Sequence, residues 1–155
     1  MNISAIVSED VVTVDIEDTI LDVATVLREE RVGSAVVLNA NGEVAGMVTD
    51  RDLVVYGQMY ADSLDQTLVN EVLTVDVVSV SPDTSIEAVT ETMREEGVRR
   101  VPVVEYGDLH GIVTLDDIVV HLAGELDNQK LRNIAAVIES ESPTRSADSL
   151  ESETE

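Results

Sequence analysis

The chain of 155 residues contains no cysteine, no phenylalanine and no tryptophan, and only three tyrosines. The lack of cysteine excludes disulfides and thiolate chemistry, and it fits a cytoplasmic location. No apolar run approaches the roughly 20 residues of a membrane-spanning helix, and the opening residues Met1–Ser4 do not resemble a signal peptide. Val, Ile, Leu and Ala must therefore fill the core, and hydrophobic residues, at 44% of the chain, are plentiful enough to do so.

Basic residues are also scarce. Nine Lys and Arg stand against 32 Asp and Glu, which gives a formal net charge of −23, and Lys130 is the only lysine. Such a surface repels a nucleic-acid backbone, so we expect no direct nucleic-acid binding. The acidic residues are spread over the whole chain, which favours adaptation to a salt-rich cytoplasm. A basic protein partner is the alternative explanation.

One seven-residue phrase occurs twice. Residues 46–52 (GMVTDRD) recur as residues 111–117 (GIVTLDD), and the stretches that precede the two phrases repeat as well. Two copies are too few for an open solenoid, so we expect a pair of units packed face to face. The chain then divides into a first repeat at 1–58, a linker at 59–69, a second repeat at 70–125 and a C-terminal segment at 126–155.

Each repeat has the pattern of a strand, a helix, two strands joined by a hairpin and a second helix. In the first repeat the predicted elements are Val11–Val14, Thr19–Arg31, Ser34–Leu38, Glu43–Val48 and Thr49–Tyr56. In the second repeat they are Val77–Val80, Ser85–Glu96, Val101–Val104, Leu109–Val113 and Leu115–Leu126. The pattern predicts a mixed α/β (α+β) fold made of two βαββα units.

The remaining segments are less regular. Gln58–Asn70 is polar and is typical of a linker, and Glu71–Leu73 predicts a short helical turn. After Gly124 the pattern changes, and an apolar stripe along Leu131–Ile138 predicts one more stretch of helix. Glu139–Glu155 has almost nothing to bury, so we expect it to be disordered.

The two repeats resemble the cystathionine-β-synthase-type (CBS) motif. The resemblance is carried by the strand Arg100–Val104 and above all by the two phrases that end in Asp52 and Asp117, and it covers roughly residues 1–125. It implies that the motifs pack about a pseudo-twofold axis into one module, often called a Bateman domain, which commonly forms a homodimer. It also implies a stand-alone, non-catalytic regulator that signals to a protein partner. The implied ligand contains adenosine (AMP, ADP, ATP or S-adenosylmethionine) and lies in clefts between the motifs.

The repeated phrase has the chemistry that a nucleotide site needs. A strand ends at Thr49 or Thr114 and a helix begins at once, so free backbone N–H groups and the positive end of the helix dipole favour a phosphate there. The Asp three residues later, Asp52 or Asp117, can accept hydrogen bonds from a ribose diol. The same spacing also forms a helix-capping box. One Asp can cap the helix in the empty state and bind ribose in the filled state.

The candidate binding residues lie in the opening strands, at the starts of the second strands and in the repeated phrases: Thr13, Ser34, Thr49, Arg51, Asp52, Ser79, Arg99, Arg100, Val101, Pro102, Thr114 and Asp117. The two copies are not equivalent. The first has Gly33-Ser34 where the second has Arg99-Arg100, and Arg51 where the second has Asp116. We therefore expect one better site, lined by the strand and phrase of the second copy, with Arg51 reaching across the axis to it.

Two other classes of function compete with ligand sensing. An enzyme needs a nucleophile with a base or a metal site, and neither His110 nor His121 has a partner of that kind nearby in the sequence. We therefore expect no catalytic residue, no metal and no cofactor. The stronger competitor is a protein-interaction or dimerisation module without a tight nucleotide, with the acidic tail and the stripe Leu131–Ile138 as its contact.

Overall fold

The first half of the molecule contains a three-stranded sheet. Strand β1 (Thr13–Asp15) pairs in parallel with β2 (Ser34–Leu38), and β2 pairs antiparallel with β3 (Val44–Thr49). Helix α1 (Ile20–Glu30) connects β1 to β2, and α2 (Asp50–Val55) follows β3 directly. The computed structural model from which these elements are taken describes residues 1–75, 77–125 and 129–141.

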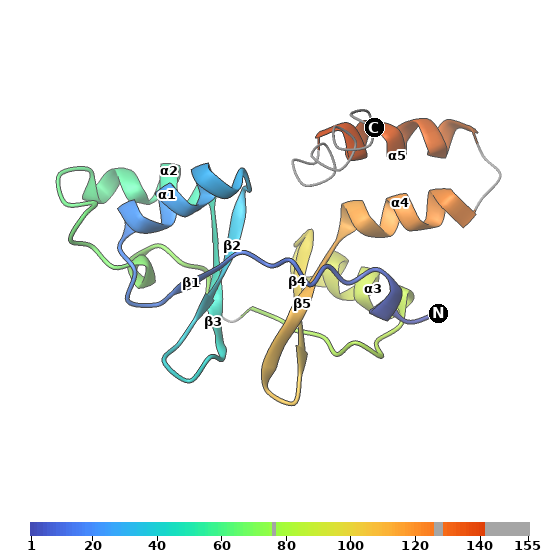
Figure 1. The fold of residues 1–155 in the computed structure, drawn as a ribbon, viewed down its shortest axis with the longest axis horizontal. Helices are drawn as coiled ribbons and strands as arrows, with labels where there is room; N and C mark the ends of the chain where they lie inside the picture. The colour runs from blue at the N-terminus through green and yellow to red at the C-terminus, as the bar shows by residue number, and fades with distance from the viewer. Residues whose placement is uncertain (76, 126–128, 142–155) are drawn as a thin grey trace, which may run out of the picture.

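The second half repeats this order. Helix α3 (Ile86–Glu96) leads into the antiparallel pair β4 (Arg100–Glu105) and β5 (Asp108–Thr114), and α4 (Leu115–Glu125) follows β5. Helix α5 (Gln129–Glu141) then runs back antiparallel to α4 (Figure 1). Short 3₁₀ turns lie at η1 (Ile3–Ala5), η2 (Gly57–Tyr60) and η3 (Val69–Glu71). The two sheets lie next to each other in the middle of the molecule (Figure 1), and the predicted mixed α/β fold of two repeated units is confirmed.

Each half is completed by a segment that crosses over from the other part of the chain. Ile3 is fully buried in the core of the second half, and its N–H donates to the Thr84 carbonyl at 2.9 Å. Val69 is fully buried in the core of the first half, and its N–H donates to the Asp18 carbonyl at 2.8 Å. The two contacts occupy equivalent positions of the repeat. The pseudo-twofold symmetry therefore extends to individual backbone hydrogen bonds.

The repeated glycine lies where a crossing segment meets a sheet. Ser8 and Ile112 exchange two backbone hydrogen bonds of 2.9 Å, and Thr74 makes the equivalent pair of bonds with β3. A Cβ on Gly111 would stand 2.5 Å from the Ser8 carbonyl oxygen, and a Cβ on Gly46 would collide with the Thr74 carbonyl oxygen. Both glycines are therefore required by the close approach of a second backbone.

Two apolar clusters, one in each half, form the core. They consist of Val, Ile, Leu, Ala and Met side chains, as the lack of large aromatic residues predicts. Among the residues that the structure describes, no polar or charged side chain is buried. Polar side chains instead set the helix starts. Thr19 and Asp22 form a capping box at the start of α1, with both hydrogen bonds at 3.1 Å, and Ser85 caps α3.

The opening strand of the second half differs from the prediction. The strand expected at Val77–Val80 is reduced to a single backbone bridge made by its last residue. In the first half, the N–H groups of Ile16 and Val36 donate across the β1–β2 pair at 2.9 and 3.0 Å. The equivalent positions of the second half are Pro82 and Pro102, which have no N–H to donate. Two of the hydrogen bonds that hold the first strand in place are therefore missing from the second.

The segment between the repeats is packed against the first half. The N–H groups of Ile20 and Leu21, at the start of α1, donate to the carbonyls of Thr67 and Leu64 at 2.9 and 3.0 Å. The helical turn that was expected at Glu71–Leu73 begins two residues earlier, as η3. These contacts follow from the crossing arrangement, because the chain must pass α1 to bring Val69 into the first core.

The C-terminal helix is longer than predicted. Its apolar stripe was expected at Leu131–Ile138, whereas α5 runs from Gln129 to Glu141, so the residues 139–141 are helical and not disordered. Ala135 on α5 and Ala123 on α4 are both buried, and such small side chains allow the two helices to approach closely. The rest of the predicted disordered tail, residues 142–155, lies outside the described residues.

Candidate functional site

A cleft of about 1140 Å³ lies between the two halves. The first half lines it through the connection from α1 into β2 (residues 31–36). The second half lines it through the start of β4, the β5–α4 junction and Ile138 of α5, and the first crossing segment (residues 5–12), which is hydrogen-bonded to β5 through Ser8, completes the wall. Figure 1 shows the crossing segment running across the middle of the molecule, with α4 and α5 above it. The cleft is therefore built from both repeats and from the helix that follows them.

The β5–α4 junction contributes a hydroxyl and a carboxylate to the cleft wall. The Thr114 hydroxyl donates to Asp117 Oδ2 at 2.7 Å, and the Asp117 N–H donates to Thr114 Oγ1 at 3.1 Å. Both side chains are partly exposed. The pair stands at the start of a helix of eleven residues, so the helix dipole favours negative charge at this point. This end of the cleft can accept hydrogen bonds from a diol and accommodate an anion beside it.

The equivalent pair in the first half forms a complete capping box. The Thr49 N–H donates to Asp52 Oδ2 at 2.9 Å, and the Asp52 N–H donates to Thr49 Oγ1 at 3.1 Å. The helix that they cap, α2, has six residues. Neither side chain is part of the wall of the large cleft. The capping role that the sequence allowed is therefore realised at Thr49 and Asp52.

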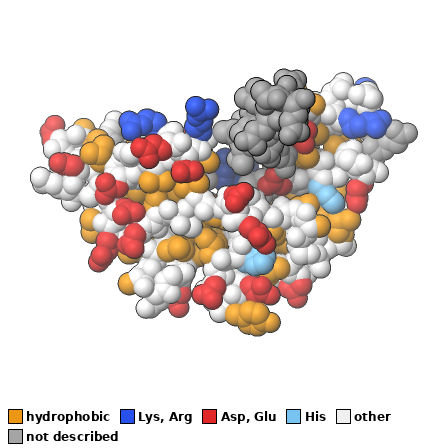
Figure 2. Space-filling model, viewed as in Figure 1, with side chains coloured by type: hydrophobic (Ala, Val, Ile, Leu, Met, Phe, Trp, Pro, Cys, Tyr) orange, Lys and Arg blue, Asp and Glu red, His pale blue; other side chains and the backbone are white. Residues whose placement is uncertain are grey.

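Three arginines of the described residues line the cleft: Arg31, Arg99 and Arg100. Figure 2 shows acidic side chains spread over this face of the molecule, whereas Lys and Arg lie along its upper edge. Arg99 Nη2 donates to Asp116 Oδ1 at 3.1 Å, with side chains that are 69% and 48% exposed. Such an exposed pair is worth at most about 1 kcal/mol, so Arg99 can be redirected to a ligand at little cost.

The predicted binding residues separate into two groups. Those that line the cleft are Ser34, Arg99, Arg100, Thr114 and Asp117. Those that are not part of its described wall are Thr13, Thr49, Arg51, Asp52, Ser79, Val101 and Pro102. Val101 and Pro102 are fully buried in the sheet. Thr13 lines a separate hollow of about 330 Å³ that also includes Gly42 of the first hairpin and Asp108 of the second.

Arg51 does not take the place that the sequence hypothesis gave it. The first half meets the cleft through the connection into β2, whereas Arg51 lies in the first turn of α2, beyond β3, with an exposed side chain. The arginine that the first half contributes is Arg31, at the end of α1. Alignment of the two copies could have drawn attention to Arg31, because the second copy has Gly97 at the equivalent position.

Other lining residues carry no motif of their own. The crossing segment supplies an apolar wall that includes Ile6, Val7 and Val12, and α5 supplies Ile138. His121 of α4 also reaches the cleft. Its Nε2 lies 2.9 Å from the sulfur of Met1 and 3.6 Å from Glu125. Sequence periodicity does not identify these residues, because it does not show which half a crossing segment packs against.

Two other classes of site can be assessed on the described part of the chain. Within residues 1–75, 77–125 and 129–141, no group of three or more His, Cys, Asp or Glu side chains is placed to hold a metal ion. In the same residues, none of the helices is both long enough and apolar enough to cross a membrane.

Comparison with known sequences identifies both repeats. The CBS domain profile matches residues 3–58 and 69–124. The CBS domain-containing protein YhcV of Bacillus subtilis is 35% identical over 127 residues, which are 81% of this chain and 89% of YhcV. Hypoxic response protein 1 of Mycobacterium tuberculosis is 32% identical over 117 residues, 76% of this chain and 82% of that protein. The protein MK0525 of Methanopyrus kandleri is 30% identical over 120 residues; the match is 77% of this chain but 61% of MK0525, under two thirds of its length.

Solved structures of similar proteins have the same fold. The crystal structure of Hypoxic Response Protein I, with two coordinated zinc ions, matches with a TM-score of 0.70 at 30% identity, over 78% of this chain and 98% of that one. The CBS domain pair of MJ0100, in complex with 5′-methylthioadenosine and S-adenosyl-L-methionine, matches with a TM-score of 0.69 over 81% of this chain and 98% of that one. At 22% identity, this second match shows the fold alone. With two matched repeats, sequence relatives and a common fold, the chain belongs to the CBS-domain family and contains two CBS domains.

Proposed function

We propose that the chain binds an adenosine-containing ligand (AMP, ADP, ATP or S-adenosylmethionine) in the cleft between its halves and acts as a non-catalytic regulator. The observation that carries the proposal is the composition of the cleft. In a chain of net charge −23, three arginines line the same cleft as Thr114 and Asp117. Arginines concentrated in this way favour an anionic ligand.

Each part of such a ligand has a matching part of the cleft. The Asp117 carboxylate accepts from the ribose diol, and the Thr114 hydroxyl and the N-terminal N–H groups of α4 face a phosphate. The arginines pair with further phosphate oxygens. The apolar side chains of the crossing segment, Val7 and Val12 among them, cover the faces of the adenine. A single bound ligand would then contact the crossing segment, the first half and α4 at the same time.

The fold comparison supports the proposal at a general level. The MJ0100 pair contains 5′-methylthioadenosine and S-adenosyl-L-methionine, so the arrangement of two CBS domains is able to hold adenosine compounds. The choice of cleft in the present chain depends on its own residues, above all Thr114, Asp117 and the three arginines.

A thermal-shift screen tests the proposal. At least one of AMP, ADP, ATP and S-adenosylmethionine should raise the melting temperature, because a ligand that binds only the folded state stabilises it by about 2.7 kcal/mol at 100 times its Kd. For a chain of this size that corresponds to a rise of roughly 5–10 °C. Guanosine nucleotides at the same concentration control for general effects of charge. If none of the four compounds changes the melting temperature, the interaction module becomes the better description.

The surface charge supports a second proposal, that the chain is adapted to a salt-rich cytoplasm. Repulsion among 32 acidic residues, only partly offset by nine basic ones, destabilises the compact state and is screened by salt. The melting temperature of the free chain should therefore rise by several degrees between about 0.1 M and about 2 M KCl. A melting temperature that stays constant or falls over this range would contradict salt adaptation and favour a basic partner as the reason for the charge.

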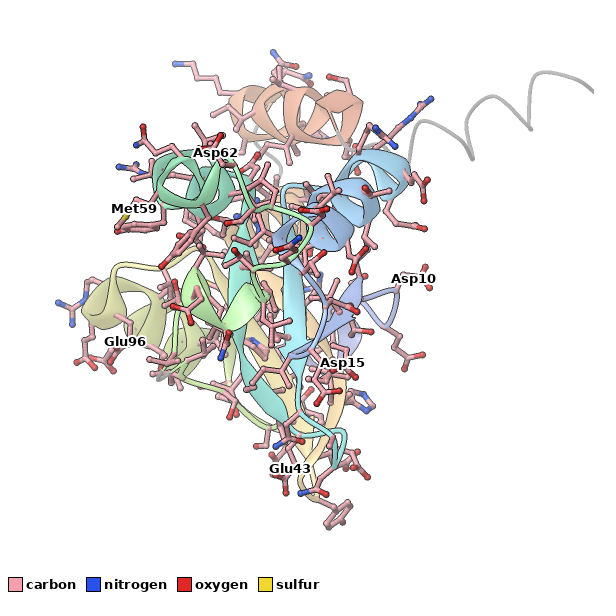
Figure 3. All side chains as sticks on the ribbon, turned by 90° about the vertical axis from the view of Figure 1, so that its left-hand side faces the viewer. Asp10, Asp15, Glu43, Met59, Asp62 and Glu96 are labelled. Carbon is pink, nitrogen blue, oxygen red and sulfur yellow. The ribbon has the colours of Figure 1, made fainter. Side chains whose placement is uncertain are left out.

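We further propose that the chain forms a homodimer and that the dimer signals to a protein partner. Exposed apolar side chains on α2 and η2 support a contact surface there: Val54 is 73% exposed and Met59 74% exposed. Figure 3 shows Met59 on the outer side of the first half. The stripe on α5 is a weaker candidate, because Ala135 is buried and Ile138 lines the cleft. Sedimentation equilibrium of the wild type and of Met59→Ser tests this surface, with weaker association of the variant as the expected result.

A further inference from the structure

Arg31 has an unusual backbone conformation for its residue type. It caps the C-terminal end of α1 in the left-handed region, with φ 55° and ψ 44°. The equivalent helix of the second half, α3, ends in the same conformation at Gly97, with φ 65° and ψ 36°. Glycine adopts this region without a steric penalty, whereas a residue with a Cβ is strained in it. The first copy therefore keeps a strained arginine where the second has the residue best suited to that conformation.

Within the described residues, no polar contact of the Arg31 side chain offsets this strain. Its side chain is exposed, and within the described residues its guanidinium group makes no hydrogen bond or ion pair. Arg99, by comparison, is paired with Asp116. The described polar contacts therefore do not explain why an arginine occupies this position. The backbone conformation ends α1, but it does not require an arginine, and non-glycine residues held in the left-handed region cluster at functional sites.

The position of Arg31 indicates which group its side chain can meet. Arg31 lies on the first-half side of the cleft, and Arg99 and Arg100 lie on the second-half side with Thr114. A guanidinium group carries its charge at every physiological pH and matches the geometry of phosphate oxygens. Arginines on both sides of one cleft are suited to an extended anion that reaches from one half to the other.

We infer that Arg31 is a phosphate-binding residue and that it makes the cleft selective for phosphorylated adenosine compounds over phosphate-free ones. The inference rests on the proposed function and narrows its ligand class to AMP, ADP and ATP. It predicts opposite effects of one substitution. Arg31→Gly removes the strain and stabilises the chain, and it also removes the charge and weakens phosphate binding.

The experiment compares Arg31→Gly with wild type by calorimetric titration and thermal unfolding. The melting temperature of the variant without ligand should be roughly 2 °C higher. Its affinity for ADP and ATP should fall about tenfold, the usual scale for one charge-assisted contact, while its affinity for adenosine stays the same. Arg28→Ala is the matched control, because Arg28 is an exposed arginine of the same helix that does not line the cleft. It should leave all three affinities unchanged.

Several outcomes would overturn the inference. An equal loss of affinity for adenosine and for ADP would mean that Arg31 supports the shape of the cleft and does not contact phosphate. If Arg28→Ala loses as much affinity for ADP and ATP as Arg31→Gly does, the effect is a long-range effect of charge and not a contact with phosphate. Titration with inorganic pyrophosphate separates the inference from the proposed function. If the wild type binds no adenosine compound but binds pyrophosphate in an Arg31-dependent way, the adenosine proposal fails and the phosphate site stands; if it binds neither, both fail.

Discussion

Replacement of Gly111 with alanine is expected to lower the free energy of unfolding by about 3 kcal/mol. The new Cβ would stand 2.5 Å from the Ser8 carbonyl oxygen and would collide with the Val7 side chain. The crossing segment must then move away from β5, and the two hydrogen bonds of 2.9 Å between Ser8 and Ile112 are strained or lost. For a chain of this size, the loss corresponds to a fall in melting temperature of roughly 6–12 °C. Thermal unfolding followed by circular dichroism measures it.

Two further glycine variants control for this effect. Gly46→Ala should destabilise the chain to a similar degree, because its Cβ would collide with Leu73 and with the Thr74 carbonyl. Gly124→Ala is the opposite case. Gly124 lies in α4, and among the described residues no atom outside its own stretch of helix comes within 4 Å of an added Cβ, so the substitution should be neutral or stabilise the chain by up to about 1 kcal/mol. If all three variants unfold at the wild-type temperature, the crossing segments do not approach the sheets as described.

Replacement of Asp117 with alanine is expected to weaken nucleotide binding between tenfold and about a hundredfold. In the proposed complex the carboxylate accepts hydrogen bonds from the ribose diol, and hydrogen bonds to a charged group contribute about 1.5–3 kcal/mol. The variant also loses the hydrogen bond of 2.7 Å from the Thr114 hydroxyl, so a small loss of stability is expected as well. Calorimetric titration with the nucleotide that gives the largest thermal shift measures the affinity.

Asp52→Ala is the matched control for this variant. Asp52 stands at the equivalent position, and its substitution removes a capping hydrogen bond of 2.9 Å from α2. The loss of a cap costs roughly 1 kcal/mol in either half, but Asp52 does not line the cleft. Its variant should therefore bind the nucleotide with less than a twofold change in Kd. Equal losses of affinity in the two variants would contradict the assignment of the ligand to the Asp117 side.

Much of the fold could be predicted from the sequence because it depends on residue types and spacings within short segments. The capping box of Thr19 and Asp22 and the two hairpins follow from residue type and spacing, and the internal repeat fixed the pairing of the halves. The shortening of the strand before Pro82 could also have been predicted from the sequence, since proline cannot donate a hydrogen bond. The crossing segments were not, because periodicity shows that Ile3 and Val69 are apolar but not which core they enter.

The candidate site was predictable in part for the same reason. Thr114 and Asp117 lie in the repeated phrase itself, and Arg99 and Arg100 stand out because the first copy has Gly33-Ser34 at their positions. Arg31 lies outside that phrase, and its importance depends on a left-handed backbone conformation and on a cleft that only the packed molecule forms. The repeated phrase also could not show that its first copy would close into a capping box away from the large cleft.

A crystal structure of the chain grown with the nucleotide of largest thermal shift tests the central claim most directly. We expect the nucleotide in the cleft between the two halves. Its ribose diol should lie within hydrogen-bond distance of Asp117, and its phosphates should lie between Arg31 and the arginines that begin β4. A nucleotide bound only at Thr49 and Asp52, or a cleft without nucleotide at saturating concentration, would contradict the account.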